Sequence, residues 1–130
     1  MYPENLRYFQ EHTWLRVEGK IGIVGITYYA QQALANVVYI DLPRIGTEVK
    51  AGMVFGSIES VKVVSDLYAP VSGKIVEVNE KLFDTPELVN ADPYDAGWMI
   101  KIEIFNFEEV SSLLSCVEYQ NIVESGGSNR

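Results

Sequence analysis

The alternation of hydrophobic and polar positions along this 130-residue chain predicts a protein built mainly of β-strands. The cleanest alternation runs over Trp98–Ile104, where Trp98 and the isoleucines at positions 100, 102 and 104 fall on one face. Met99, Lys101 and Glu103 would then fall on the other face, because neighbouring side chains of a strand point in opposite directions. This segment therefore predicts a half-buried strand.

Shorter apolar and β-branched runs predict further strands joined by tight turns. The tripeptide Glu18-Gly19-Lys20 separates two of them, and a glycine in so short a connection indicates a hairpin. Glycines at positions 46, 52 and 56 punctuate a later stretch, in which Val49, Val54 and Ile58 mark short strands. The remaining runs are Trp14–Val17, Ile21–Ile26, Val37–Leu42, which Pro43 ends, and Ile75–Val78. Together these runs favour a compact barrel or sandwich.

Two internal helices are expected between the strands. Thr27 suits the N-cap of a helix over Tyr28–Ala35, because a threonine hydroxyl can accept a hydrogen bond from the first turn. The dipeptide Thr85-Pro86 predicts a second helix with proline at its first position, and Asn90 a stop. The segment Asp92–Gly97 is rich in turn-forming residues and predicts a loop.

The last part of the chain predicts one helix that packs on the sheet. Asn106 and Glu109 have the spacing of a capping box. Apolar residues then follow at helical spacing, at Val110, Leu113, Leu114 and Val117. Residues 125–130 are polar and glycine-rich, which predicts a disordered tail. Because no linker separates two cores, we expect a single domain over residues 1–124.

Composition and charge narrow the classes of partner. Hydrophobic residues make up 48% of the chain, which is typical of a soluble globular protein. Ten basic and eighteen acidic residues give a net charge of −8, which disfavours nucleic acid. No apolar run approaches the roughly 20 residues that cross a bilayer, and Met1–Gln10 lacks the features of a signal or transit peptide. The one cysteine, Cys116, is interpreted as a partly buried filler and suits a reducing compartment, so a cytoplasmic location in a bacterium is expected.

The residues that enzymes commonly use are scarce. His12 is the only histidine, so a Ser-His-Asp or Cys-His arrangement would have to use it, and we interpret it as a structural hydrogen-bonding residue. A zinc site normally needs several histidine and cysteine ligands, and the chain has one of each. Glycine-rich phosphate-binding motifs are missing from the sequence. The chain is therefore expected to be neither a self-sufficient enzyme nor a metalloprotein.

One lysine has a setting that suits covalent modification. Lys62 stands between Val61 and Val63, with strand-like residues leading in and out, so a hairpin would place it at or beside the tip. Its primary amine on a flexible stem can be acylated there, and a ligase can reach it from outside. Glu59 and Asp66 flank it and are candidates for recognition by that ligase. The alternative is an ordinary solvated lysine in a loop.

The same segment resembles a known family. Glu59-Ser-Val-Lys62, followed by Ser65-Asp-Leu-Tyr-Ala-Pro-Val-Ser-Gly73, is similar to the lipoylation segment of the glycine cleavage system H protein family. The likeness extends over residues 5 to 118 and includes Glu11-His-Thr-Trp14, Gly25-Ile-Thr27, Val37–Pro43, Pro86–Asn90, Asp92–Tyr94 and Gly97-Trp98.

This resemblance implies a fold, a cofactor and partners. The implied fold is a mainly β, lipoyl/biotinyl-type barrel-sandwich hybrid of two small antiparallel sheets, with short helices and a C-terminal helix. Lys62 would bear lipoate, attached by a lipoate-protein ligase or lipoyl transferase. The lipoyl group would accept an aminomethyl group at a pyridoxal-phosphate glycine decarboxylase and pass it to an aminomethyltransferase. A dihydrolipoyl dehydrogenase would then reoxidise it, so the chain itself would be a non-catalytic carrier.

The resemblance also implies a cleft that shelters the loaded arm. Its walls would come from residues near Glu11–Trp14, from the Tyr28–Ala35 helix and from Asp66, which makes Glu11, His12, Thr13 and Tyr28 candidate cleft residues. Four positions depart from the family pattern: Thr13 and Asn36 stand where acidic residues are common, Tyr28 where aspartate is usual, and Ala35 where glycine is typical. Thr13 matters most, because a carboxylate would pair with an aminomethyl nitrogen.

Two alternatives therefore stay open beside glycine cleavage. One is an H-like lipoate-binding protein that carries sulfur intermediates in a heterodisulfide-reductase-like oxidation pathway. The other is an unmodified binding or scaffold module. The sequence is silent on the oligomeric state: the exposed face of the Trp98–Ile104 strand could pair with a second copy, but a monomer is the default expectation.

Overall fold

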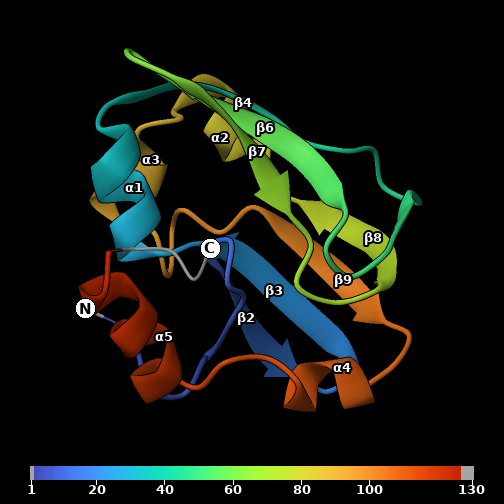
Figure 1. Ribbon diagram of the computed structural model, residues 1–130. Coiled ribbons are helices and arrows are strands. Elements are labelled where there is room, and N and C mark those ends of the chain that lie inside the picture. Colours follow the sequence, from blue (N-terminus) through green and yellow to red (C-terminus); the bar gives the residue numbers. More distant parts are fainter. Residues whose placement is uncertain (1, 127–130) are drawn as a thin grey trace.

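Nine strands form two antiparallel sheets in the computed structural model, which describes residues 2–126 (Figure 1). The larger sheet has the order β1-β2-β3-β9-β8-β5, and the smaller sheet has the order β4-β6-β7. The strands are β1 (Arg7–Tyr8), β2 (Thr13–Glu18), β3 (Ile21–Ile26), β4 (Val37–Asp41), β5 (Glu48–Val49), β6 (Val54–Ser60), β7 (Val64–Tyr68), β8 (Gly73–Val78) and β9 (Ile100–Ile104). This arrangement confirms the predicted mainly β fold class.

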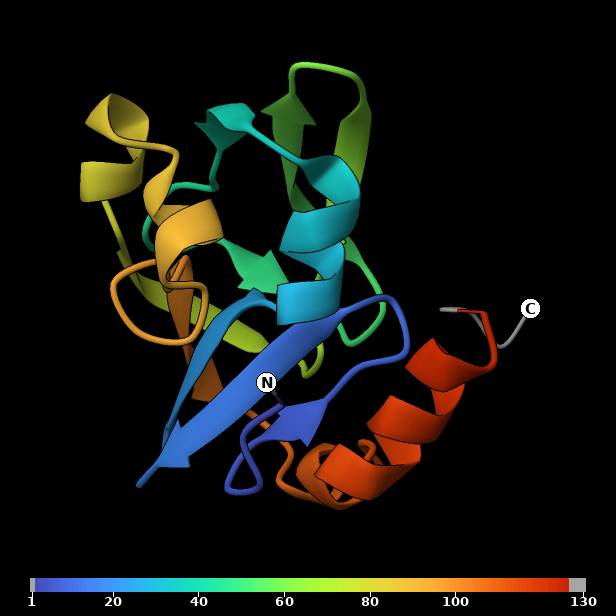
Figure 2. The same cartoon turned by 90° about the vertical axis from the view of Figure 1, so that its left-hand side faces the viewer.

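Five short helices surround the sheets: α1 (Tyr28–Leu34), α2 (Lys81–Asp84), α3 (Leu88–Ala91), α4 (Glu108–Ser111) and α5 (Cys116–Glu124). Thr27 is the N-cap of α1 as predicted, and its side chain accepts a hydrogen bond from the Ala30 N–H. Figure 2 shows α1 in cyan beside the green β6–β7 hairpin, whose tip projects beyond the helix. None of the helices in the described part of the chain is long and apolar enough to cross a membrane.

The first half of the strand β2 is buried on both faces, because each face packs against a different cluster. Leu15 belongs to the main core, to which strands of both sheets contribute side chains. Trp14 points the other way, into a second cluster with Leu6, Tyr8, Ile23 and Tyr119. The helix α5 contributes Tyr119 to this second cluster, which explains how a strand near the edge of the sheet comes to bury a fully enclosed tryptophan. Cys116 packs partly buried against the same cluster, as the sequence suggested.

The predicted hairpin at Gly19 forms between β2 and β3, and its geometry uses two glycines. Gly19 has φ +64° at the turn, a left-handed conformation that glycine adopts without steric cost. Gly25 lies opposite Trp14 across the pair, and a Cβ there would lie 2.6 Å from the Trp14 ring. The close packing of the indole on the sheet therefore depends on the missing side chain.

The alternation predicted over Trp98–Ile104 is correct only in its second half. The strand β9 begins at Ile100, and Met99 is fully buried instead of facing solvent. Met99 joins the main core together with Ile100, whereas Trp98 packs against the second cluster. Two consecutive side chains, those of Met99 and Ile100, therefore lie in the main core where the strand begins.

The predicted C-terminal helix is present as α5, but the expectation of one continuous helix from residue 106 is wrong. Asn106 and Glu109 form no capping box, because the carboxylate of Glu109 accepts hydrogen bonds from the Ser72 N–H (2.7 Å) and Ser72 hydroxyl (3.0 Å). The chain makes the short α4, breaks, and starts again at α5, where Ser115 and Glu118 form the capping box. Val117 is consequently 66% exposed.

Smaller differences occur elsewhere in the chain. The turn at Thr85-Pro86 precedes α3, which begins two residues later at Leu88, and α2 was not predicted. Asn90 lies inside α3, and its side chain donates to the Ala35 carbonyl (2.6 Å) and accepts from the Val37 N–H (2.9 Å). The expected tail is described only at residues 125 and 126, and the rest of that prediction lies outside the described residues.

Candidate functional site

Lys62 lies in the turn that joins β6 to β7, at the tip of a hairpin of the smaller sheet (Figures 1 and 2). The last paired residues on either side are Glu59 and Val64. Four residues therefore form the connection, and Lys62 is the third of them. The expectation that this lysine stands at the end of a hairpin matches the observed backbone.

The turn is held by a buried serine. The Ser60 hydroxyl accepts hydrogen bonds from the N–H groups of Lys62 and Val63, both at 3.2 Å, and the Ser60 N–H donates to the Val63 carbonyl at 2.8 Å. The Val61 N–H donates to the Asn36 carbonyl (3.0 Å), which ties the tip to the start of β4. These contacts fix the backbone on both sides of Lys62.

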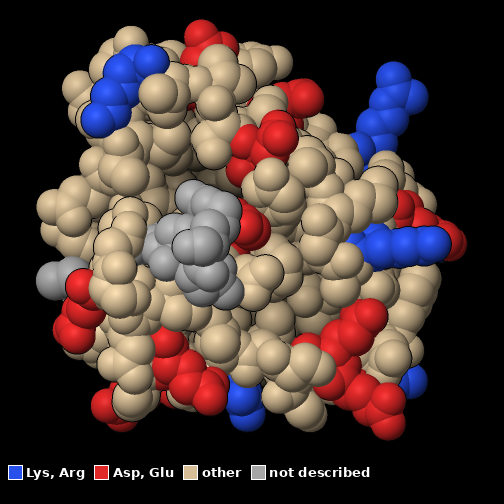
Figure 3. Space-filling view, viewed as in Figure 1, with Lys and Arg blue, Asp and Glu red and all other residues tan. Residues whose placement is uncertain are grey.

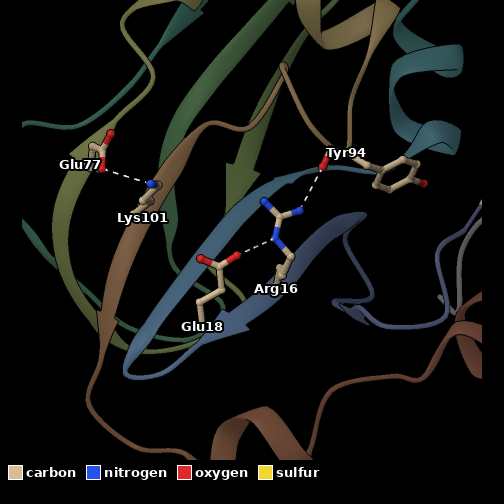
Figure 4. A network of polar contacts seen from close by, with 5 residues as sticks. All are labelled: Arg16, Glu18, Glu77, Tyr94 and Lys101. Atoms are coloured by element: carbon tan, nitrogen blue, oxygen red, sulfur yellow. Dashed lines mark hydrogen bonds and ion pairs between the residues drawn. The ribbon is translucent and has the colours of Figure 1, made fainter.

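The Lys62 side chain itself is exposed. Its neighbours Val61, Val63 and Val64 are 66%, 45% and 68% exposed, so the tip is an apolar surface around one cation. Two ion pairs occur within residues 2–126, Arg16 with Glu18 and Lys101 with Glu77, and neither involves this hairpin (Figure 4). The Lys62 amine is thus accessible from solvent and has no carboxylate partner among the described residues.

The two acidic residues that flank Lys62 both lie on the hairpin strands. Glu59 on β6 is exposed, and Asp66 on β7 is exposed and paired with Ser57. Figure 3 shows acidic side chains spread over this view of the molecule, with basic side chains only at isolated positions. The electrostatic potential of this acidic face of the molecule would attract a partner with a basic face.

A cleft of about 290 Å³ opens directly beside the tip. One wall comes from β7 and the residue before it, a second from α1, and a third from the segment that leads into β2. The lining residues are Glu11, His12, Thr13, Ile26, Tyr29, Ala30, Ala33, Leu34, Ile58, Val63, Val64, Ser65, Asp66 and Leu67. Because Val63 already lines the cleft, a group attached to Lys62 would begin within one residue of it.

Three of the four predicted cleft residues line this cleft, but Tyr28 does not. Each residue of a helix advances by about 100°, so the cleft face of α1 carries Tyr29 and Ala33 together, while Tyr28 falls beside it. The Tyr28 N–H instead donates to the Tyr94 hydroxyl oxygen at 2.8 Å. The sequence indicated which side of the helix faces the cleft, because the small residues Ala30 and Ala33 lie on that side.

Thr13 lines the cleft without offering it a hydroxyl. The residue is 1% exposed, and its Oγ1 donates to the Tyr68 carbonyl at 3.0 Å. Thr13 therefore joins the start of β2 in the larger sheet to the end of β7 in the smaller one. The carboxylates that line the cleft are those of Glu11 and Asp66.

His12 combines an unusual backbone with a buried contact. Its φ is +77°, in the left-handed region that residues with a Cβ rarely adopt. Its N–H donates to the Phe9 carbonyl (2.9 Å), its carbonyl accepts from the Thr27 N–H (3.1 Å), and its Nδ1 lies 2.7 Å from the Tyr119 hydroxyl. The structural interpretation of His12 from the sequence matches these bonds.

Burial raises the pKa of three phenols near the second cluster, those of Tyr8, Tyr94 and Tyr119, well above the ordinary value. These groups keep their protons at neutral pH and act there as hydrogen-bonding groups without charge.

No group of three or more potential metal ligands comes together within the described residues. The arrangement offers a modifiable amine and a sheltered cleft.

Comparisons with known proteins agree with this arrangement. Residues 6–126 match the family described as glycine cleavage H-protein. The chain is 54% identical to the glycine cleavage system H protein of Carboxydothermus hydrogenoformans over 125 residues, 96% of each chain. It is 52% identical to the protein of the same name from Symbiobacterium thermophilum, over 95% of this chain and 97% of that one.

A solved structure gives the same result for the fold. The crystal structure of a glycine cleavage system H protein from Mycobacterium marinum superimposes with a TM-score of 0.84 at 37% identity, covering 95% of this chain and 98% of that one. These similarities support the glycine-cleavage interpretation and give no support to the sulfur-oxidation alternative.

Proposed function

Because the chain belongs to the glycine cleavage H-protein family, whose members are lipoyl carriers in glycine cleavage, we propose that its carrier site is Lys62, with lipoate attached as an amide. The observation that carries this proposal is the placement of one exposed amine at a braced hairpin tip beside a cleft. When bound, lipoate supplies the chemistry of the carrier, a disulfide that takes up the aminomethyl group and is left as a dithiol when the group moves on.

The residues of the tip have two tasks in this proposal. Ser60 holds the backbone so that the Lys62 amine is presented outward in a defined position. Glu59 and Asp66 stand on the two strands and mark the site for a lipoate-protein ligase or lipoyl transferase. The exposed valines beside Lys62 leave no bulky side chain over the amine.

The cleft next to the tip shelters the loaded arm between visits to partner enzymes. Its walls are apolar along α1 and β7, through Ala30, Ala33 and Leu67, and these side chains exclude water from a labile cargo. Glu11 and Asp66 provide negative charge at the same place, which suits a cargo with an amine. Thr13 takes no part in this pairing, since its hydroxyl is already bonded to Tyr68.

A carrier of this kind depends on other enzymes for each chemical step. Family membership implies partners such as glycine decarboxylase and aminomethyltransferase. We propose that the decarboxylase uses pyridoxal phosphate, that a dihydrolipoyl dehydrogenase reoxidises the arm, and that this chain works as a monomer without catalytic residues of its own.

The attachment site is tested by intact-mass measurement after incubation with a lipoate ligase, lipoate and ATP. We expect one lipoyl addition to the parent chain and none to Lys62→Arg, which keeps the charge but has no acylatable amine. Lys20→Arg is the matched control, because Lys20 is an exposed lysine in the turn of another hairpin. An adduct that persists in Lys62→Arg, or one that disappears in Lys20→Arg, would refute the assignment.

A further inference from the structure

A chain of three hydrogen-bonding groups lies behind the wall of the cleft. The Tyr119 hydroxyl lies 2.7 Å from His12 Nδ1 and 2.7 Å from Thr27 Oγ1. Tyr119 and Thr27 are fully buried, and His12 is the member that also lines the cleft. These three hydrogen-bonded side chains connect α5, the N-cap of α1 and the segment before β2.

The number of protons available to the three hydrogen-bonded groups determines which ring nitrogen of His12 carries a proton. Thr27 Oγ1 already accepts a hydrogen bond from the Ala30 N–H at 3.2 Å, so its own proton is left to donate. If Thr27 donates to the Tyr119 oxygen, Tyr119 donates to His12 Nδ1, and both contacts are filled. A proton on Nδ1 would be a third proton for two contacts, and one buried hydroxyl would lose its acceptor.

Two features keep this arrangement in place. Burial raises the pKa of the Tyr119 phenol, so the proton it donates is retained. The Tyr119 ring is stacked on Tyr8 at a centroid distance of 4.9 Å, and the capping box of Ser115 and Glu118 anchors the start of its helix. His12 is equally fixed, since its backbone is bonded to Phe9 and Thr27 on either side.

We propose that Tyr119 is a positioning residue that holds His12 as the neutral tautomer with its proton on Nε2. The imidazole then lines the cleft without adding a positive charge to it. This matters if the cleft shelters a cargo with an amine, a consequence that rests on the proposed function. A protonated imidazole would repel such a cation, whereas Glu11 and Asp66 attract it.

The tautomer is measured directly by long-range proton–nitrogen correlation NMR on the full-length, unmodified chain at neutral pH. His12 is the only histidine, so its two ring nitrogens give the only imidazole signals. We expect Nδ1 at the chemical shift of a nitrogen without a proton and Nε2 at that of a protonated nitrogen. A protonated Nδ1, alone or together with Nε2, would overturn the proposal.

Two variants separate positioning from general packing. Tyr119→Phe removes the hydroxyl and keeps the ring, and we expect both nitrogens to move toward the average of exchanging tautomers. Tyr94→Phe is the control, because it removes another buried phenol hydroxyl, one bonded to the Tyr28 N–H. Equal spectra for Tyr119→Phe and the parent chain would overturn the assignment to Tyr119. If Tyr119→Phe fails to fold, the spectrum of the parent chain still decides the tautomer.

This measurement is independent of the proposed carrier function. It uses no lipoate and no partner enzyme, so the tautomer can be confirmed even if Lys62 is never modified. Conversely, lipoylation of Lys62 can be confirmed while His12 proves to carry its proton on Nδ1. The two proposals therefore fail separately.

Discussion

Replacing Ser60 by alanine should loosen the tip that presents Lys62. The substitution removes a hydroxyl that accepts two backbone N–H groups at 3.2 Å and donates to the Val63 carbonyl at 3.3 Å. These distances are at the long end of the normal range, and both N–H groups belong to exposed residues that water can reach. We therefore expect a loss of about 1 kcal/mol in the free energy of unfolding, or about 4 °C in Tm for a chain of this length.

The matched control for this variant is Ser65→Ala on the opposite strand of the same hairpin. The Ser65 hydroxyl has one contact at 3.5 Å, with the Asp66 carbonyl, and the residue is exposed. We expect its unfolding free energy to stay within about 0.5 kcal/mol of the parent chain.

Chemical denaturation and hydrogen exchange measure the two effects. Exchange of the Lys62 and Val63 amide protons should accelerate about fivefold in Ser60→Ala, the factor that corresponds to 1 kcal/mol of local stability. The rate of lipoylation by a ligase should fall in the same variant, because the amine is held less rigidly. If Ser60→Ala and Ser65→Ala show the same stability and the same exchange rates, the hydroxyl does not hold this turn and the reasoning is refuted.

Two further predictions concern the backbone and the buried phenols. Ala35 has φ +62°, so Ala35→Gly should relieve strain and raise the unfolding free energy by roughly 0.5–2 kcal/mol, while Ala33→Gly within α1 should lower it by about 1 kcal/mol. A loss of stability in both variants on thermal unfolding would contradict the strained geometry. Burial raises the pKa of Tyr8 and Tyr119 in the folded state, so above about pH 10 these phenols ionise in the unfolded chain first. The free energy of unfolding should therefore fall by about 1.4 kcal/mol per pH unit for each phenol. Denaturation midpoints that stay constant between about pH 9 and pH 11 would show that these phenols titrate normally.

Local patterns in the sequence were sufficient for the hairpin and for α1. The strand residues on both sides of Lys62 pair with each other, so their spacing alone places the lysine at the tip. Thr27 caps α1 through a contact only three residues away. Such features depend on neighbours in the chain, which a sequence displays directly.

Features that depend on distant contacts were not predictable in the same way. Glu109 has the spacing of a capping residue, but Ser72, 37 positions earlier, takes its carboxylate. Met99 breaks the alternation because it packs in the main core together with Ile100. Tyr119 contacts His12 although 107 positions separate them in the chain, and no local sequence pattern at either residue indicates that contact.

The same limit applies to the cleft. Residues 11 to 13 were placed there by resemblance, and the structure shows that Thr13 contributes packing and a bond to Tyr68 instead of a polar contact for the cargo. The cleft is lined by Tyr29 and not by Tyr28, a difference of one helix position. Sequence spacing resolves such a difference only when the orientation of the helix on the sheet is known.

The most direct test of the account is glycine decarboxylation with the lipoylated chain and glycine decarboxylase, followed as release of labelled carbon dioxide. We predict that release depends on the lipoylated chain, is lost with Lys62→Arg and is retained with Lys20→Arg. Decarboxylation supported equally by the Lys62→Arg chain would contradict the claim that the arm on this hairpin carries the cargo.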